Sequence, residues 1–133
     1  MIDIFYKKSK MEREIKSYRD LIVWQKSMAL VTSIYKLTEQ FPQSEIYGLT
    51  SQMRRSAVSI PSNIAEGSKR SSRKDFKNFL QIASGSGAEL ETQVEIAKRM
   101  FFGRTLDYQD IDSMLNEVMR MLNSFIKRLS VSN

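Results

Sequence analysis

The chain has 133 residues, the usual size of a single domain. It contains no cysteine and no histidine, which excludes disulfides, thiolate or imidazole metal sites and the common His- or Cys-based catalytic arrangements. No run of about 18 or more apolar residues and no secretory leader pattern occurs, so we expect a cytoplasmic protein without a membrane span. Lysine and arginine outnumber aspartate and glutamate by 21 to 15, and the net charge of +6 favours contact with polyanions.

Residues 1–19 are expected to form a basic N-terminal arm, and residues 20–133 a bundle of four helices. In the first expected helix, which starts at Asp20, apolar residues recur every three or four positions, the spacing of one helix face. Two such rows lie side by side: Leu21, Trp24, Met28, Val31 and Tyr35 form one, and Leu30, Ile34, Leu37 and Phe41 form the other. Pro42 ends the helix because it has no N–H to donate.

The second expected helix begins within residues 44–48 and ends at Gly67. Its apolar row consists of Leu49, Met53, Ala57, Ile60 and Ile64. Pro61 lies inside this row, where it removes one backbone hydrogen bond, and it is expected to kink the helix. A polar turn follows, in which Ser71 or Ser72 can cap the next helix.

The third expected helix has the strongest pattern in the chain, an unbroken heptad spacing of four and three residues. Its positions are Phe76, Leu80, Ala83, Gly87, Leu90, Val94, Ala97 and Phe101. The side chains of residues 83–88 are all small, which favours a close approach of another backbone. A fourth helix is expected after Gly103, with Asp107 or Asp110 as its cap and Ile111, Leu115, Val118, Leu122, Phe125 and Leu129 as its row. This pattern predicts an all-α, antiparallel up-down-up-down four-helix bundle.

No catalytic site, no cofactor and no metal ion are predicted. Glu89, Glu91 and Glu95 are the carboxylates that come closest to a site, but a solvated helix face paired with Lys98 and Arg99 is the simpler interpretation. An enzyme that uses carboxylates alone is therefore the least favoured alternative, because the usual acid–base groups are missing.

Seven basic residues gather between positions 54 and 77, opposed there only by Glu66 and Asp75. They are the candidate nucleic-acid-binding residues: Arg54, Arg55, Lys69, Arg70, Arg73, Lys74 and Lys77. Serine and asparagine side chains among them, and the N-terminus of the third helix, offer hydrogen-bond donors to phosphate oxygens. The alternative is a solvated loop with internal ion pairs, such as Arg55 with Glu66 or Arg54 with a carboxylate on the next helix. Local chemistry alone leaves both alternatives open.

Three aromatic side chains, those of Trp24, Phe76 and Phe79, could stack on nucleobases. Their helical spacing instead favours burial in a core or an interface. Apolar residues beyond the main rows, such as Phe79 and Phe102, exceed what one small bundle needs, and such a surplus predicts self-association.

Three segments of the chain carry a resemblance: DLIVWQK at 20–26, SQMRRSAVSIPSNIAEGSKRSS at 51–72 and FLQIASGSGAELETQVEIAKR at 79–99. Together they resemble the four-helix-bundle family of 23S rRNA intervening-sequence proteins, over about residues 20–129. The resemblance implies a ring-shaped homopentamer with a basic surface. It also implies a polar signature on the second helix, formed by Arg54, Arg55, Ser62, Asn63 and Glu66. The family includes the accessory variability determinant of diversity-generating retroelements, which acts with a reverse transcriptase and nucleic acid.

The sequence therefore predicts a non-enzymatic, oligomeric nucleic-acid-binding bundle. RNA or an RNA–DNA hybrid is the expected partner, and a reverse transcriptase or another protein is a further candidate. The alternative is a protein–protein adaptor, a ring without direct nucleic-acid contact. Burial of Arg54 and Arg55 in ion pairs would favour the adaptor.

Overall fold

The computed structural model describes residues 15–131, and four α-helices contain most of them. They are α1 (Ile22–Thr38), α2 (Leu49–Ser68), α3 (Arg73–Arg99) and α4 (Gln109–Ser130). Two short 3-10 helices, η2 (Tyr18–Asp20) and η3 (Gln43–Glu45), precede α1 and α2. This part of the chain has no strand, so the expected all-α class is confirmed for it. Of the arm predicted for residues 1–19, positions 1–14 lie outside the described residues.

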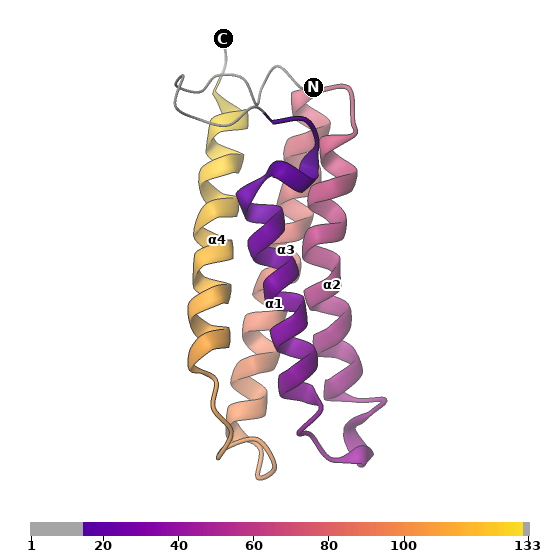
Figure 1. The fold of residues 1–133 in the computed structure, drawn as a ribbon, viewed down its shortest axis with the longest axis vertical. Coiled ribbons are helices and arrows are strands. Elements are labelled where there is room, and N and C mark those ends of the chain that lie inside the picture. Colours follow the sequence, from indigo (N-terminus) through magenta and orange to yellow (C-terminus); the bar gives the residue numbers. More distant parts are fainter. Residues whose placement is uncertain (1–14, 132–133) are drawn as a thin grey trace.

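The four helices lie side by side in a bundle (Figure 1). Each helix packs against two others: α2 and α4 each contact both α1 and α3. The α1–α2 and α3–α4 connections lie at one end, whereas the short α2–α3 turn lies at the other end, where α4 finishes. The bundle therefore presents the α2–α3 turn, with its basic residues, at one of its two ends.

The two apolar rows predicted for α1 have different surroundings. Leu30, Ile34 and Leu37 are buried and form the contribution of α1 to the core. The neighbouring row is used only in part, since Met28 is 42% exposed and Tyr35 is 41% exposed. The outer row of α1 therefore leaves apolar and aromatic surface on the outside of the bundle.

The predicted α3 row holds through Ala97, with each of its positions buried. Its last position is wrong, because α3 ends at Arg99 and Phe101 lies in the following turn, 82% exposed. Phe102 packs inward instead, its ring centroid 5.0 Å from that of Phe41 in an edge-to-face contact. The heptad spacing thus continued for one position beyond the helix itself.

The expected serine cap of α3 is confirmed, whereas the N-cap of α4 is Tyr108 and neither Asp107 nor Asp110. Ser72 is the N-cap of α3, and its hydroxyl accepts a hydrogen bond from the backbone N–H of Asp75 at 3.0 Å. At the start of α4, a carboxylate oxygen of Asp107 accepts from the backbone N–H of Gln109 at 3.0 Å. Both bonds satisfy donors that a helix start would otherwise leave unpaired.

Helix α2 continues through Gly67 to Ser68, so Gly67 does not end it. A Cβ on Gly67 would lie 2.6 Å from the Cβ of Phe79 and 3.3 Å from the carbonyl oxygen of Phe76. Only a glycine at this position permits α2 and α3 to approach so closely. Pro61 is buried inside α2, and the kink that it was expected to cause stays a prediction.

The small side chains in the middle of α3 have other roles than the predicted backbone contact. Gly87 faces the side chain of Met119 on α4, whereas Gly85 has no atom of another element within 4 Å of its side-chain position. Ser86 is buried, and its hydroxyl lies 2.7 Å from that of Ser59 on α2. This hydroxyl pair fixes the register between α2 and α3, because sliding the helices would leave buried polar groups unpaired.

Candidate nucleic-acid interface

The structure places the seven candidate basic residues in two separate regions. Arg54 and Arg55 lie in the first half of α2. The other five surround the turn between α2 and α3, and we refer to them as the turn cluster: Lys69, Arg70, Arg73, Lys74 and Lys77. Arg55 and Lys69 are separated by about 21 Å along the helix axis, given a rise of 1.5 Å per residue. One compact phosphate site cannot include both regions.

Three lysines of the turn cluster are available for contact with a ligand. Lys69 and Lys74 are exposed, and Lys77 is half-buried. Within residues 15–131, none of the three side chains makes a hydrogen bond or an ion pair. Their charges are therefore balanced only by solvent and by more distant groups.

The two arginines of the turn cluster are partly committed to the protein. Arg70 forms an ion pair with Glu66 at 3.0 Å, and its guanidinium lies 4.8 Å from the centroid of the Phe79 ring. Arg73 donates a hydrogen bond to the backbone carbonyl of Arg128 at 3.1 Å, near the end of α4. Arg128 adds a further exposed cation at this end of the bundle. The sequence interpretation missed Arg128, although basic residues in the last turn of α4 were a signal for it.

The N-terminus of α3 offers less to an anion than its position suggests. Ser72 already accepts a hydrogen bond from the N–H of Asp75. The exposed carboxylate of Asp75 also lies in the first turn, where it offsets the positive end of the helix dipole. Anion binding at this turn would therefore depend mainly on the lysine and arginine side chains.

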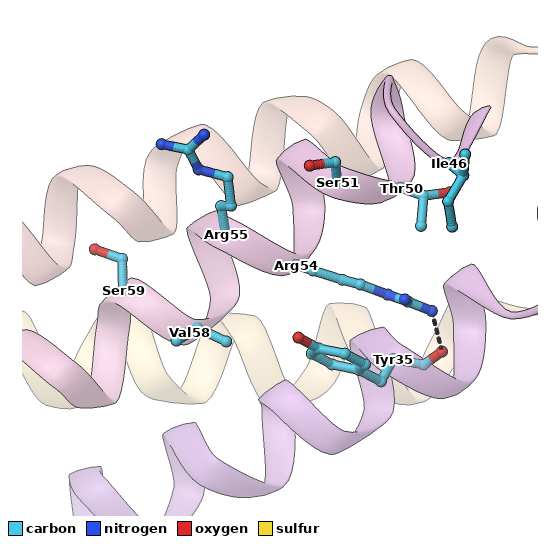
Figure 2. A pocket seen from close by; sticks show the side chains of 8 residues that line it. All are labelled: Tyr35, Ile46, Thr50, Ser51, Arg54, Arg55, Val58 and Ser59. Atoms are coloured by element: carbon cyan, nitrogen blue, oxygen red, sulfur yellow. Dashed lines mark hydrogen bonds between the residues drawn. The ribbon is translucent and has the colours of Figure 1, made fainter.

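Arg54 stabilises the end of α1 rather than pairing with a carboxylate. Its Nε donates to the hydroxyl of Thr38 at 2.9 Å, and a terminal nitrogen donates to the carbonyl of Tyr35 at 3.5 Å. Its guanidinium lies over the Tyr35 ring, 4.4 Å from the centroid (Figure 2). The ion pair considered for Arg54 does not form within the described residues. The sequence interpretation missed Tyr35 and Thr38, since no local spacing links them to a residue on the next helix.

Arg55 is exposed and makes no hydrogen bond or ion pair with any residue that the structure describes. The ion pair considered between Arg55 and Glu66 is absent, because Glu66 pairs with Arg70 in the turn that follows α2. Arg54 and Arg55 are thus neighbours in sequence that differ in their contacts: the side chain of Arg54 is hydrogen-bonded within the protein, and that of Arg55 is not.

An open groove of 520 Å³ lies between α1 and α2, beside these two arginines (Figure 2). Tyr35 and Arg54 form one part of its lining, and Arg55, Ser51 and Ser59 of α2 form another. No carboxylate lines the groove. Its lining therefore combines the Tyr35 ring, two guanidinium groups, three serine or threonine residues and the apolar side chains of Ile46 and Val58, a combination suited to an anionic organic ligand.

Comparisons with known proteins agree with this architecture. The sequence model of the 23S rRNA-intervening sequence protein family matches residues 19–124. The chain belongs to this family. A crystal structure of a protein with unknown function from the S23 ribosomal protein family of Bacteroides thetaiotaomicron VPI-5482 is similar, with 30% sequence identity and a TM-score of 0.70. The similarity covers 80% of this chain and 99% of that chain. No curated protein gives a significant match.

Some residues of the polar signature that the family resemblance implied on α2 form hydrogen bonds within the protein. The amide nitrogen of Asn63 donates to the carbonyl of Ser59 at 2.8 Å and to its hydroxyl at 3.0 Å. Because Ser59 also bonds to Ser86 of α3, Asn63 supports the α2–α3 contact. Ser62 is exposed, and its hydroxyl donates back to the carbonyl of Val58 at 2.8 Å. Asn63 therefore has a structural role that is independent of any ligand.

The three aromatic side chains that were candidates for stacking on nucleobases mostly pack within the protein. Phe76 is fully buried, and its ring centroid lies 5.1 Å from that of Phe125. Trp24 is half-buried against Tyr18, at 5.3 Å. Phe79 is half-buried beneath the guanidinium of Arg70. The expectation of burial is confirmed for Phe76 and met in part by Trp24 and Phe79.

The carboxylates of α3 do not converge on a common point. Glu89 and Glu91 are exposed, whereas Glu95 pairs with Lys98 at 3.1 Å. Lys98 also pairs with Asp112 of α4 at 2.8 Å, and this hydrogen bond, with that to Glu95, raises the pKa of Lys98. Within residues 15–131, no three acidic side chains gather as metal ligands would, and no helix has the length and apolar character needed to cross a membrane.

Proposed function

We propose that this family member is a non-enzymatic, oligomeric helical bundle that binds RNA phosphates at the turn cluster. The observation that carries this proposal is the concentration of five basic side chains around one short turn at the end of the bundle. Two of them, Lys69 and Lys74, are exposed and have no partner among residues 15–131. An RNA–DNA hybrid presents the same phosphate chemistry and is the second form of the same ligand.

Burial of Arg54 and Arg55 in ion pairs would favour the adaptor alternative. Neither residue forms an ion pair within the described part of the chain. Arg54 is nevertheless held at the end of α1, so of the two only Arg55 has a guanidinium without a partner among the described residues. The balance of these contacts favours direct RNA binding over the adaptor.

Self-association belongs to the same proposal, with a homopentamer as the expected form. The outward side of α3 carries Ile82, 52% exposed, and Ile96, 42% exposed, with the open position Gly85 between them. These residues lie on one helix face by their spacing, and a second copy of the chain would cover them. Repetition of the turn cluster in an oligomer would then raise the affinity for one RNA molecule through avidity.

The test is fluorescence anisotropy of a labelled structured RNA, titrated with protein at low and at physiological salt. We expect wild-type affinity to fall steeply with salt, because each phosphate contact releases counterions. The double variant Lys69→Glu, Lys74→Glu should weaken binding by roughly tenfold or more at low salt. Neither lysine has a partner in the described structure, so the fold is expected to stay intact.

The matched control is the double variant Arg99→Glu, Arg120→Glu. Both arginines are exposed, have no partner within residues 15–131 and lie away from the α2–α3 turn. The two double variants change the net charge equally. If both reduce RNA affinity to the same extent, binding follows overall charge and the assignment to the turn cluster is wrong. If the wild-type oligomer binds no RNA at low salt, the adaptor replaces this proposal.

A further inference from the structure

The groove between α1 and α2 presents a guanidinium that the protein already holds in place. Arg54 is fixed by its bond to Thr38 and lies over the ring of Tyr35, and it lines the groove (Figure 2). A guanidinium plane held in this way can stack on an unpaired nucleobase, which shares its planar shape. The groove volume of 520 Å³ is in the range of sites that accept small organic molecules.

Arg55 supplies a charge in another part of the groove lining, where its side chain points away from Arg54 and Tyr35 (Figure 2). It is exposed and has no partner in the described part of the chain, although it lines the same groove. Ser51, one helical turn before it, places a hydroxyl in the groove lining, whereas the hydroxyl of Ser59 is already engaged with Ser86. A strand whose base stacks on Arg54 and that continues across α2 would therefore find Arg55 as a cation for one of its phosphates and Ser51 as a hydrogen-bond donor.

The face of α2 that leads from the groove to the turn cluster has no bulky obstacle. Arg55, Ser62 and Lys69 follow each other at intervals of seven residues, which places them on one helix face. Val58 and Ala65 lie between them, and both have small side chains. The only carboxylate along this part of α2 is that of Glu66, which pairs with Arg70. A polyanion can therefore follow α2 without meeting an unpaired negative charge.

We infer that the groove between α1 and α2 binds one unpaired nucleotide of an RNA strand that continues along α2 to the turn cluster. The base stacks on the guanidinium of Arg54, and one phosphate of the strand binds Arg55. This inference rests on the proposed function and adds a preference for single-stranded RNA, because bases in a continuous duplex are not available for stacking. Single-stranded segments of RNA are thus the ligand of the groove, whereas the turn cluster accepts any RNA backbone.

The test compares two probes, a short labelled single-stranded RNA and the same RNA annealed to its complement. Arg55→Gln should weaken binding of the single strand roughly fivefold or more, and should lower the slope of log affinity against log salt by about 0.7. Binding of the duplex should not change. Arg55→Lys should restore most of the single-strand affinity, and Arg120→Gln, at another exposed arginine without a partner, is the control for net charge.

A second measurement locates the base directly. A single-stranded RNA that contains 4-thiouridine is cross-linked to the wild-type oligomer by light, and the modified peptide is identified by mass spectrometry. We expect a cross-link in the peptides that contain Tyr35 or Arg54. Arg54→Lys keeps the charge and removes the planar group, so it should reduce this cross-link while the circular dichroism of the protein stays helical.

The outcomes separate this inference from the proposed function. If Arg55→Gln binds both RNAs as the wild type does while Lys69→Glu, Lys74→Glu loses them, the turn cluster alone binds RNA and the inference is wrong. Equal weakening of single strand and duplex by Arg55→Gln also contradicts it, because no unpaired nucleotide is then recognised. If the wild type binds neither RNA, the proposed function itself fails. A changed sedimentation profile of Arg55→Gln would place Arg55 in a subunit contact and overturn the inference.

Discussion

At the scale of single residues, Arg54 and Arg55 show how neighbours with the same chemistry acquire different roles. Arg54 makes a part-buried hydrogen bond to Thr38 and a cation–π contact with Tyr35. We expect Arg54→Ala to lower the free energy of unfolding by about 1–2 kcal/mol, because both contacts and the favourable charge at the end of α1 are lost. Urea unfolding at a fixed protomer concentration measures this change.

Arg55→Ala is the matched control for that substitution. Arg55 is exposed and has no partner among residues 15–131, so its truncation should change the unfolding free energy by less than about 0.5 kcal/mol. Equal losses for the two variants would show that Arg54 does not stabilise α1 in the way that its contacts indicate.

At the scale of helices, two glycines should respond in opposite ways to the same substitution. In an exposed helix interior, glycine to alanine stabilises by about 1 kcal/mol. Gly85→Ala should show this gain, since no atom of another element lies within 4 Å of its side-chain position. Gly67→Ala should instead destabilise by about 1–3 kcal/mol, because the new methyl group would meet Phe79 and the backbone of Phe76. Thermal unfolding of both variants, followed by circular dichroism, is the measurement.

A gain in stability for Gly67→Ala would mean that α2 and α3 can separate at this point without cost. The conclusion that glycine is required there for close helix packing would then be wrong. Loss of stability for Gly85→Ala would instead indicate that another copy of the chain covers this position on α3.

At the scale of the whole molecule, the exposed apolar residues of α3 predict self-association. Analytical ultracentrifugation of the wild type at tens of micromolar should give a mass well above the 15.5 kDa of one chain, with five copies as the expected number. Ile82→Glu, Ile96→Glu should shift the mass toward that of one chain, because a buried carboxylate is costly at an interface. Tyr47→Glu, at a residue that is 95% exposed in the α1–α2 connection, is the control.

A wild-type mass of 15.5 kDa at these concentrations would contradict the predicted oligomer. A mass that falls equally with Tyr47→Glu would place the interface at the end of the bundle that carries the α1–α2 connection. The first result would remove avidity from the account of RNA binding and leave the turn cluster as a single-copy site, whereas the second would keep an oligomer and move its interface away from α3.

Much of the fold could be predicted because hydrophobic periodicity reports burial directly. The rows of α4 and of α3 through Ala97 coincide with buried positions, and that of α2 does so from Met53 onward, whereas Leu49 is only half-buried. Periodicity is less informative where a pattern continues by chance, as at Phe101, because the end of a helix depends on local turns. It also does not show which of two rows on α1 faces the core, since that depends on the positions of the other helices.

The candidate site was less predictable, because the role of a charged residue depends on what lies across from it. The cluster of seven basic residues was visible in the sequence, yet its division into two regions follows from the length of α2. The engagement of Arg54 by Thr38, 16 positions away on another helix, has no local sequence signal. Likewise, Glu66 pairs with Arg70, which lies four residues further along the chain just past the end of α2, whereas Arg55 lies eleven residues back along the helix.

The short connection between α2 and α3 also affects the order in which the molecule assembles. Residues 69–72 are all that separate the two helices, so little chain entropy is lost when they meet, and such local pairs form early in folding. During synthesis, this hairpin can close before α4 has been translated. For four of the five turn-cluster side chains, the neighbouring residues are then already in place. Arg73 is the last to be fixed, because the carbonyl that holds it arrives with Arg128 near the end of the chain.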